Sequence, residues 1–121
     1  MMYINPEEAT PVYQQLHDQI IVAIACGELR PGDKLDSVRG VAMNFGINPA
    51  TVKKAYDLLK EEGVIFTTGR SGSVVAHPSG NTTLLERDVR GLVAKAKTAG
   101  VAPEELHQLI DAAIDELELP A

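Results

Sequence analysis

The chain has 121 residues, 45% of them hydrophobic, which allows one compact core with a small appendage. Its single cysteine, Cys26, excludes an intrachain disulfide and favours a reducing compartment, so we expect a cytoplasmic protein. No apolar run approaches the roughly 20 residues that a membrane-spanning helix needs. The N-terminal residues also lack the basic start and apolar stretch of a secretion signal, so no membrane contact is expected.

The formal net charge of −6 argues against nonspecific nucleic-acid binding, which depends on clustered Lys and Arg. The charges are unevenly distributed, however, and most of the net negative charge lies in the last third of the chain. Between Ser37 and Tyr56 the only charged residues are Arg39, Lys53 and Lys54, all basic. Basic character is therefore local, in one short segment.

Residues 11–25 are predicted to form the first helix. Apolar side chains recur there at offsets of three and four residues: Tyr13, Leu16, Ile20 and Ile24. Thr10 suits the N-cap, Pro11 the first helical position and Gly27 the C-terminal end. The following segment, ELRPGDKL, contains a Pro-Gly turn and is expected to form a loop.

Two further helices are predicted close together. One spans about residues 37–44, with Asp36 or Ser37 as its N-cap and a glycine at its end. The next begins at Asn48, a good N-cap, and Pro49, a good first helical residue. Its inner face is apolar: Val52, Ala55, Tyr56 and Leu59. Two short helices joined by a Gly-containing turn are typical of a helix-turn-helix.

Two β-prone runs, 64–67 and 73–76, flank the sequence Gly-Arg-Ser-Gly at 69–72 and predict a β-hairpin with a basic tip. Such a hairpin after a helix-turn-helix is a wing. The turn-rich sequence HPSGN follows it, so we expect a domain boundary after residue 78. The predicted fold is mostly α with a small β-hairpin (α+β): a winged helix-turn-helix domain at 1–78 and a two-helix region at 79–121.

The two helices of residues 79–121 are separated by Gly100, and Pro103 opens the second. Their apolar stripes comprise Leu85, Val89, Leu92, Val93, Ala96, Leu106, Leu109, Ile110, Ala113, Ile114 and Leu117. A lone helical hairpin has no third layer to cover such stripes, so they must dock on the winged domain or on a second copy. The second copy is the simpler alternative, which predicts a homodimer with this segment as its dimerisation region.

The run KLDSVRGVAMNFGINPATVKKAYDLLKEEGVIFTTGRSGSVVA resembles the GntR family of bacterial regulators, and the likeness extends over residues 8–77. NPATVKKAY with a tail of only two helices is similar to its YtrA-like branch. The resemblance implies a repressor of a nearby transporter operon. It also implies that Arg39 contacts a phosphate or a guanine, and that the wing tip, with Arg70, Ser71 and Gly72, enters the minor groove.

The outward face of the third helix is predicted to meet DNA, because its inner face is needed for the core. A helix N-terminus supplies free backbone N–H groups and a partial positive charge. We expect Asn48 and Thr51 to form hydrogen bonds, Ala50 to contact a thymine methyl, and Lys53 and Lys54 to bind phosphates. The expected DNA-binding residues are Ser37, Arg39, Asn48, Pro49, Ala50, Thr51, Lys53, Lys54, Thr68, Arg70, Ser71 and Gly72.

Structural alternatives stay open at several of these positions. Arg39 could pair with Asp36, Asn48 could serve only as a cap, Lys54 could be an ordinary solvated lysine, and the wing could be a plain turn. The acidic total charge also leaves a second hypothesis, a winged helix that binds another protein instead of DNA.

Catalysis, a metal and a cofactor are not expected. The three histidines lack the spacing of a metal-ligand set, and no nucleophile elbow or Gly-rich phosphate loop occurs. The expected partners are double-stranded operator DNA, with an inverted repeat, and a second copy of the chain. A small-molecule effector of unknown identity is a further expected partner.

Overall fold

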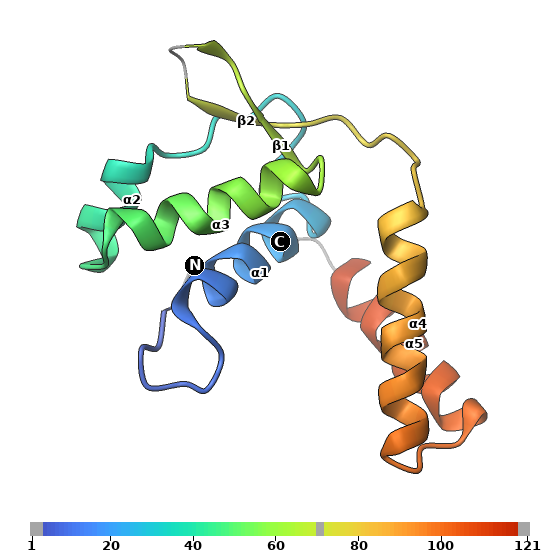
Figure 1. Cartoon of the computed structure of the whole chain (residues 1–121). Helices are drawn as coiled ribbons and strands as arrows, with labels where there is room; N and C mark the ends of the chain where they lie inside the picture. Colours follow the sequence, from blue (N-terminus) through green and yellow to red (C-terminus); the bar gives the residue numbers. More distant parts are fainter. Residues whose placement is uncertain (1–3, 70–71, 119–121) are drawn as a thin grey trace. The chain divides into compact units, whose positions relative to one another are not determined.

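A computed structural model of the chain describes residues 4–69 and 72–118 (Figure 1). The chain divides into two compact units, Met1–Pro78 and Ser79–Ala121. Within the described residues, the first unit contains α1, α2 and α3 followed by a two-stranded antiparallel sheet, and the second contains α4 and α5. This mostly helical architecture with one hairpin confirms the predicted α+β fold class.

Helix α1 (Val12–Ala25) begins one residue later than predicted. Pro11 is its N-cap, with an extended ψ of 148°, and its carbonyl accepts the first helical bonds from the backbone of Gln14 and Gln15. Thr10 therefore does not cap the helix, and that prediction is wrong. At the other end Cys26 is the C-cap and Gly27, with a φ of 82°, turns the chain away from the helix.

Helices α2 (Val38–Phe45) and α3 (Pro49–Glu61) form the helix-turn-helix, and a side-chain cap starts each. The Oγ of Ser37 accepts a hydrogen bond from the backbone of Gly40 at 3.0 Å, so Ser37 rather than Asp36 caps α2. The Oδ1 of Asn48 accepts one from the backbone of Ala50 at 2.8 Å, which confirms the predicted cap of α3.

The core of the first unit lies where α3 packs against α1 and α2 (Figure 1). Its buried apolar side chains are Leu16, Ile20, Val41, Ala42, Val52, Ala55, Tyr56, Leu59 and Ile65. Tyr56 also donates a hydrogen bond from its hydroxyl to the carbonyl of Asp36, at 2.6 Å. Burial, with the nearby Asp36 carboxylate, raises the pKa of Tyr56 to about 12, so its hydroxyl stays a donor at neutral pH.

Strands β1 (Ile65–Thr67) and β2 (Ser73–Val75) pair antiparallel, and each is one residue shorter than predicted. The loop before α2 adds to this hairpin. Lys34 forms an isolated β-bridge with Val74. On either side of this bridge, the backbone N–H of Leu35 donates to the carbonyl of Ser73 and that of Val75 donates to the carbonyl of Asp33, each at 2.9 Å. The expected loop is thus partly an extended segment that fixes the wing to the domain.

The second unit consists of α4 (Thr83–Thr98) and α5 (Pro103–Glu118), and Gly100 between them has a φ of 76°. Ala96 is the one buried member of the predicted apolar stripes among the described residues. The exposed large side chains of these stripes are Leu85, Val89, Leu92, Val93, Leu109, Ile114 and Leu117. None of the helices in the described ranges has the length and apolar character needed to cross a bilayer.

Candidate nucleic-acid interface

The N-terminal half of α3 presents a small, basic face to solvent. Pro49, Ala50, Lys53 and Lys54 are exposed and Thr51 is half-buried, because the opposite side of the helix lies in the core. This face consists of small side chains and two lysines, which give it its positive charge.

The backbone at the start of α3 offers fewer free donors than expected. Pro49 has no N–H group, the N–H of Ala50 bonds the Asn48 side chain, and that of Thr51 bonds the Asn48 carbonyl at 2.9 Å. The expectation of free backbone N–H groups here is therefore wrong, since the cap consumes them. The side-chain amide of Asn48 keeps its N–H₂ donors, because the cap uses only its oxygen.

The two lysines of α3 have different partners within the protein. The Nζ of Lys53 lies 2.7 Å from the Oδ2 of Asp57. The Nζ of Lys54 lies 4.1 Å from the centre of the Tyr13 ring of α1, a cation–π contact. Both lysines, with Tyr13 and Asp57, line an open hollow of about 460 Å³. Lys54 is therefore held against α1 and is not a freely solvated lysine.

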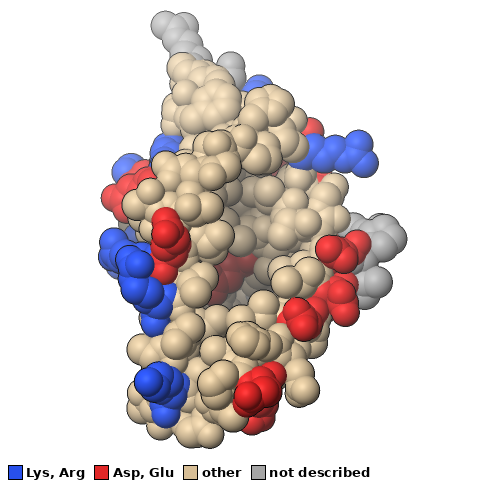
Figure 2. Space-filling view, turned by 90° about the vertical axis from the view of Figure 1, so that its right-hand side faces the viewer, with Lys and Arg blue, Asp and Glu red and all other residues tan. Residues whose placement is uncertain are grey.

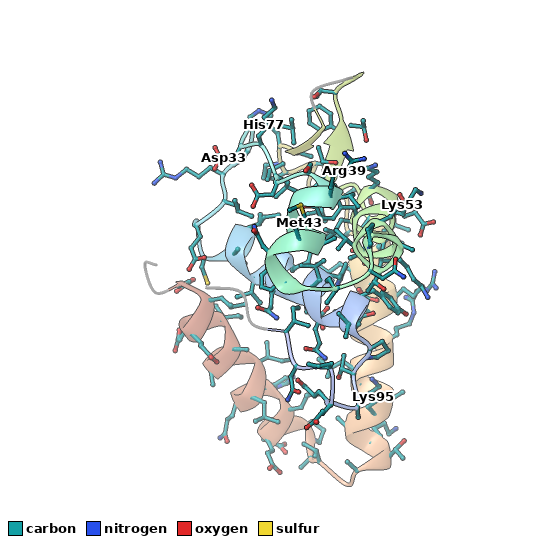
Figure 3. The ribbon with its side chains drawn as sticks, turned by 90° about the vertical axis from the view of Figure 1, so that its left-hand side faces the viewer. Asp33, Arg39, Met43, Lys53, His77 and Lys95 are labelled. Carbon is teal, nitrogen blue, oxygen red and sulfur yellow. The ribbon has the colours of Figure 1, made fainter. Side chains whose placement is uncertain are left out.

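Arg39 lies in the first turn of α2, on the helix next to the one that carries Lys53 (Figure 3). It is exposed, and within residues 4–69 and 72–118 no ion pair joins it to Asp36 or another acid. Its guanidinium is thus available to an external anion. Ser37, just before it, uses its oxygen to cap α2 and retains a hydroxyl donor.

The wing is closed by Thr68 and Gly72. The backbone N–H of Thr68 bonds the carbonyl of Gly72 at 2.9 Å, and its hydroxyl reaches the same oxygen at 3.3 Å. Gly72 is exposed, with a φ of 89° that favours glycine. Arg70 and Ser71, the other predicted wing-tip contacts, lie outside the described residues.

Two buried polar residues of α1, Gln15 and His17, make structural contacts that the sequence did not predict. Gln15, buried, accepts from the N–H of Asn5 at 2.9 Å and donates to the carbonyls of Asn5 and Thr10, each at 2.8 Å. His17, also buried, contacts Asp18 through Nδ1 and Glu62, the C-cap of α3, through Nε2. They fall beside the apolar stripe of α1, where helical periodicity alone indicates a solvent-facing edge.

The electrostatics of His17 follow from these two contacts. Burial of the ring opposes its charged form, but the hydrogen bonds and charges of Glu62 and Asp18 outweigh burial and raise the pKa of His17 above its ordinary value of 6.5. His17 therefore joins α1 to the end of α3 as an ion pair when protonated. Among the described residues no three His, Cys, Asp or Glu side chains are grouped as metal ligands.

The helix-turn-helix, the basic face of α3 and the hairpin wing together define a winged-helix protein of the DNA-binding class. Residues 12–75 match the model of the family described as "Bacterial regulatory proteins, gntR family". The HTH-type transcriptional repressor YtrA of Bacillus subtilis (strain 168) is 36% identical over 116 residues, which cover 91% of this chain and 89% of that protein.

Two solved structures extend the comparison. A transcriptional antiterminator from Listeria monocytogenes EGD-e has a TM-score of 0.82 at 30% identity, over 100% of this chain and 96% of its own. The DNA-binding domain of AraR, solved in complex with operator ORX1, has a TM-score of 0.55 at 25% identity, over 61% of this chain and 92% of its own.

The chain belongs to the GntR family of bacterial regulatory proteins, as the sequence resemblance predicted. The similarity to Bacillus subtilis YtrA over most of both chains also confirms the resemblance to the YtrA-like branch. The protein is accordingly a DNA-binding transcription regulator and not an enzyme.

Proposed function

We propose that this regulator binds an inverted-repeat operator as a homodimer, in the cytoplasm, and represses a nearby operon. The observation that carries the proposal is the exposed N-terminal face of α3, with Lys53 and Lys54, together with the exposed Arg39 of the neighbouring helix α2. In a helix-turn-helix protein this part of the second helix enters the major groove while the first helix lies on the backbone. The AraR domain solved with an operator and the repressor YtrA support this assignment.

Each exposed side chain then has a role set by its chemistry. Lys53 binds phosphate, the amide of Asn48 and the hydroxyl of Thr51 form hydrogen bonds, and Ala50 contacts a thymine methyl. Arg39 contacts a phosphate or a guanine edge. The basic wing supplies a further contact in the minor groove, whose negative potential attracts arginine.

The apolar surface of the second unit supports a homodimer. Val89 and Leu92 of α4 and Leu109 of α5 are among its exposed apolar side chains, and they would be covered by a second copy. Figure 2 shows one face of the molecule, most of which is formed by side chains other than Lys, Arg, Asp and Glu. Helix α4 carries four basic residues, Arg87, Arg90, Lys95 and Lys97, against two acidic ones, Glu86 and Asp88, whereas α5 carries Asp and Glu and no Lys or Arg. Helix α4 of one copy can therefore face α5 of the other with favourable charge.

A two-fold dimer presents two recognition helices, so its operator is an inverted repeat with half-sites about one helical turn apart or slightly more. Binding both half-sites at once raises affinity well above that of one domain. A small-molecule effector that rotates the two winged domains relative to each other would release the DNA. The regulated operon is proposed to encode a transporter, as the resemblance to YtrA-like regulators implies.

Selection of bound duplexes from a random pool, followed by fluorescence anisotropy at two salt concentrations, tests this function. The proposal predicts that an inverted repeat is enriched and that its affinity falls steeply with salt. Failure to bind any duplex, or binding that salt does not change, would instead favour a winged helix that binds another protein.

A further inference from the structure

An acid of the same helix pairs with the side chain of Lys53. Its Nζ lies 2.7 Å from the Oδ2 of Asp57, and the side chain of Lys53 is 70% exposed and that of Asp57 47%. Residues four apart in a helix lie one turn apart on the same face. The hydrogen bond from Lys53, which burial opposes and the charges of Lys53 and Lys60 support, keeps the pKa of Asp57 below its ordinary value. The carboxylate is therefore ionised at neutral pH.

The neighbouring lysine is in a different situation. The Nζ of Lys54 lies over the ring of Tyr13, and in the part of the chain that the structure describes no acid forms an ion pair with it. An aromatic ring holds a cation without cancelling its charge. Of the two lysines on the proposed DNA-binding face, Lys53 is thus the one neutralised by a carboxylate.

Resting on the proposed DNA-binding function, we propose that Asp57 restrains the affinity of α3 for DNA by competing with the phosphate for Lys53. A lysine that leaves Asp57 for a phosphate breaks its ion pair and leaves an unpaired carboxylate next to the anionic duplex. Both effects disfavour the complex relative to the free protein. Because phosphate contacts carry little sequence information, the restraint applies to operator and random DNA alike. Its effect is to limit how long the regulator stays on nonspecific DNA.

The restraint is modest, because an exposed pair on a helix surface is screened by water and salt. The restraint requires the carboxylate to lie beside Lys53, however. A general effect of net charge would be the same for an acid elsewhere on α3. Glu61 lies one turn further along α3 and is exposed, so Glu61→Gln changes the net charge of the same helix by the same amount. It provides the matched control for Asp57→Asn.

The test measures anisotropy of the full chain on two duplexes, one with the selected sequence and one random, as a function of salt. We expect Asp57→Asn to bind both roughly three- to tenfold more tightly, with a salt slope steeper by up to about 0.9, and Glu61→Gln to change affinity less than about twofold. In a Lys53→Gln background, Asp57→Asn should have a clearly smaller effect than in the original chain, because only the repulsion between the carboxylate and the duplex then remains to be relieved. Thermal unfolding of every variant confirms that the fold is retained.

Three results would overturn the inference. Equal effects of Asp57→Asn and Glu61→Gln would mean that only net charge matters. A full effect of Asp57→Asn in the Lys53→Gln background would mean that the ion pair plays no part. Failure of the original chain and of Asp57→Asn to bind either duplex would overturn the proposed function itself, and this inference with it.

Discussion

The Nε2 of His17 in α1 lies 2.5 Å from the Oε1 of Glu62, the C-cap of α3, although the two residues are 45 positions apart in the chain. The other ring nitrogen, Nδ1, lies 2.8 Å from Asp18. With a carboxylate at each nitrogen, the ring is best satisfied as an imidazolium. This contact ties the recognition helix to the helix that supports it.

The first prediction concerns pH. Because folding raises the pKa of His17 above 6.5, its contribution to stability is fully present below pH 6.5 and is lost as pH rises through the folded-state pKa. The free energy of unfolding should therefore fall over that range. Glu62→Gln should flatten the fall and cost about 1 kcal/mol at low pH. Urea denaturation across the pH series measures both effects.

Glu61→Gln, the same change at the exposed neighbouring residue, provides the control for the loss of one negative charge. A profile of Glu62→Gln that has the same slope as that of the original chain would show that the ion pair contributes nothing to stability.

The second prediction separates the two roles of Asn48. Asn48→Ala removes the cap and should destabilise the first unit by about 1 kcal/mol, whereas Asn48→Ser keeps a capping oxygen and should cost much less. Serine lacks the amide N–H₂ group, however, so Asn48→Ser should still weaken binding to the selected duplex if the amide contacts DNA. Thermal unfolding and anisotropy on the same samples give both quantities. Unchanged DNA affinity of Asn48→Ser would restrict Asn48 to its capping role.

The third prediction concerns the second unit. Val89 is exposed on the apolar face of α4, so a charge there should not disturb the folded chain but should disrupt a dimer formed through this face. Sedimentation of Val89→Glu should show a monomer that binds the operator more weakly. Ala94→Glu, an exposed position between the stripe positions of the same helix, is the control and should stay dimeric. A dimer of undiminished strength in Val89→Glu would place the interface elsewhere, in the winged unit.

Local patterns allowed much of the fold to be predicted. The apolar spacing of Val52, Ala55 and Leu59 correctly identified the inner face of α3, and the Asn48-Pro49 pair correctly located its start. These features depend on residues a few positions apart, whose geometry a helix fixes. The same locality explains the error at Thr10, since whether it or Pro11 caps α1 depends on a shift of a single residue.

Several contacts that the sequence did not predict are nonlocal. The pairing of Lys34 with Val74, the ring of Tyr13 under Lys54 and the ion pair of His17 each join segments that only tertiary packing brings together. The lost N–H donors at the start of α3 have another cause: a residue that caps a helix well also consumes the donors that would otherwise bind an anion.

The central claim, that the outward face of α3 binds DNA, is tested most directly by the salt dependence of Lys53→Gln against Lys60→Gln. Lys60 is exposed in the last turn of the same helix, so both changes remove one charge from α3. On the selected duplex, Lys53→Gln should weaken binding and reduce the salt slope by about one, while Lys60→Gln should leave both nearly unchanged. Equal affinities and slopes for the two variants would contradict the account.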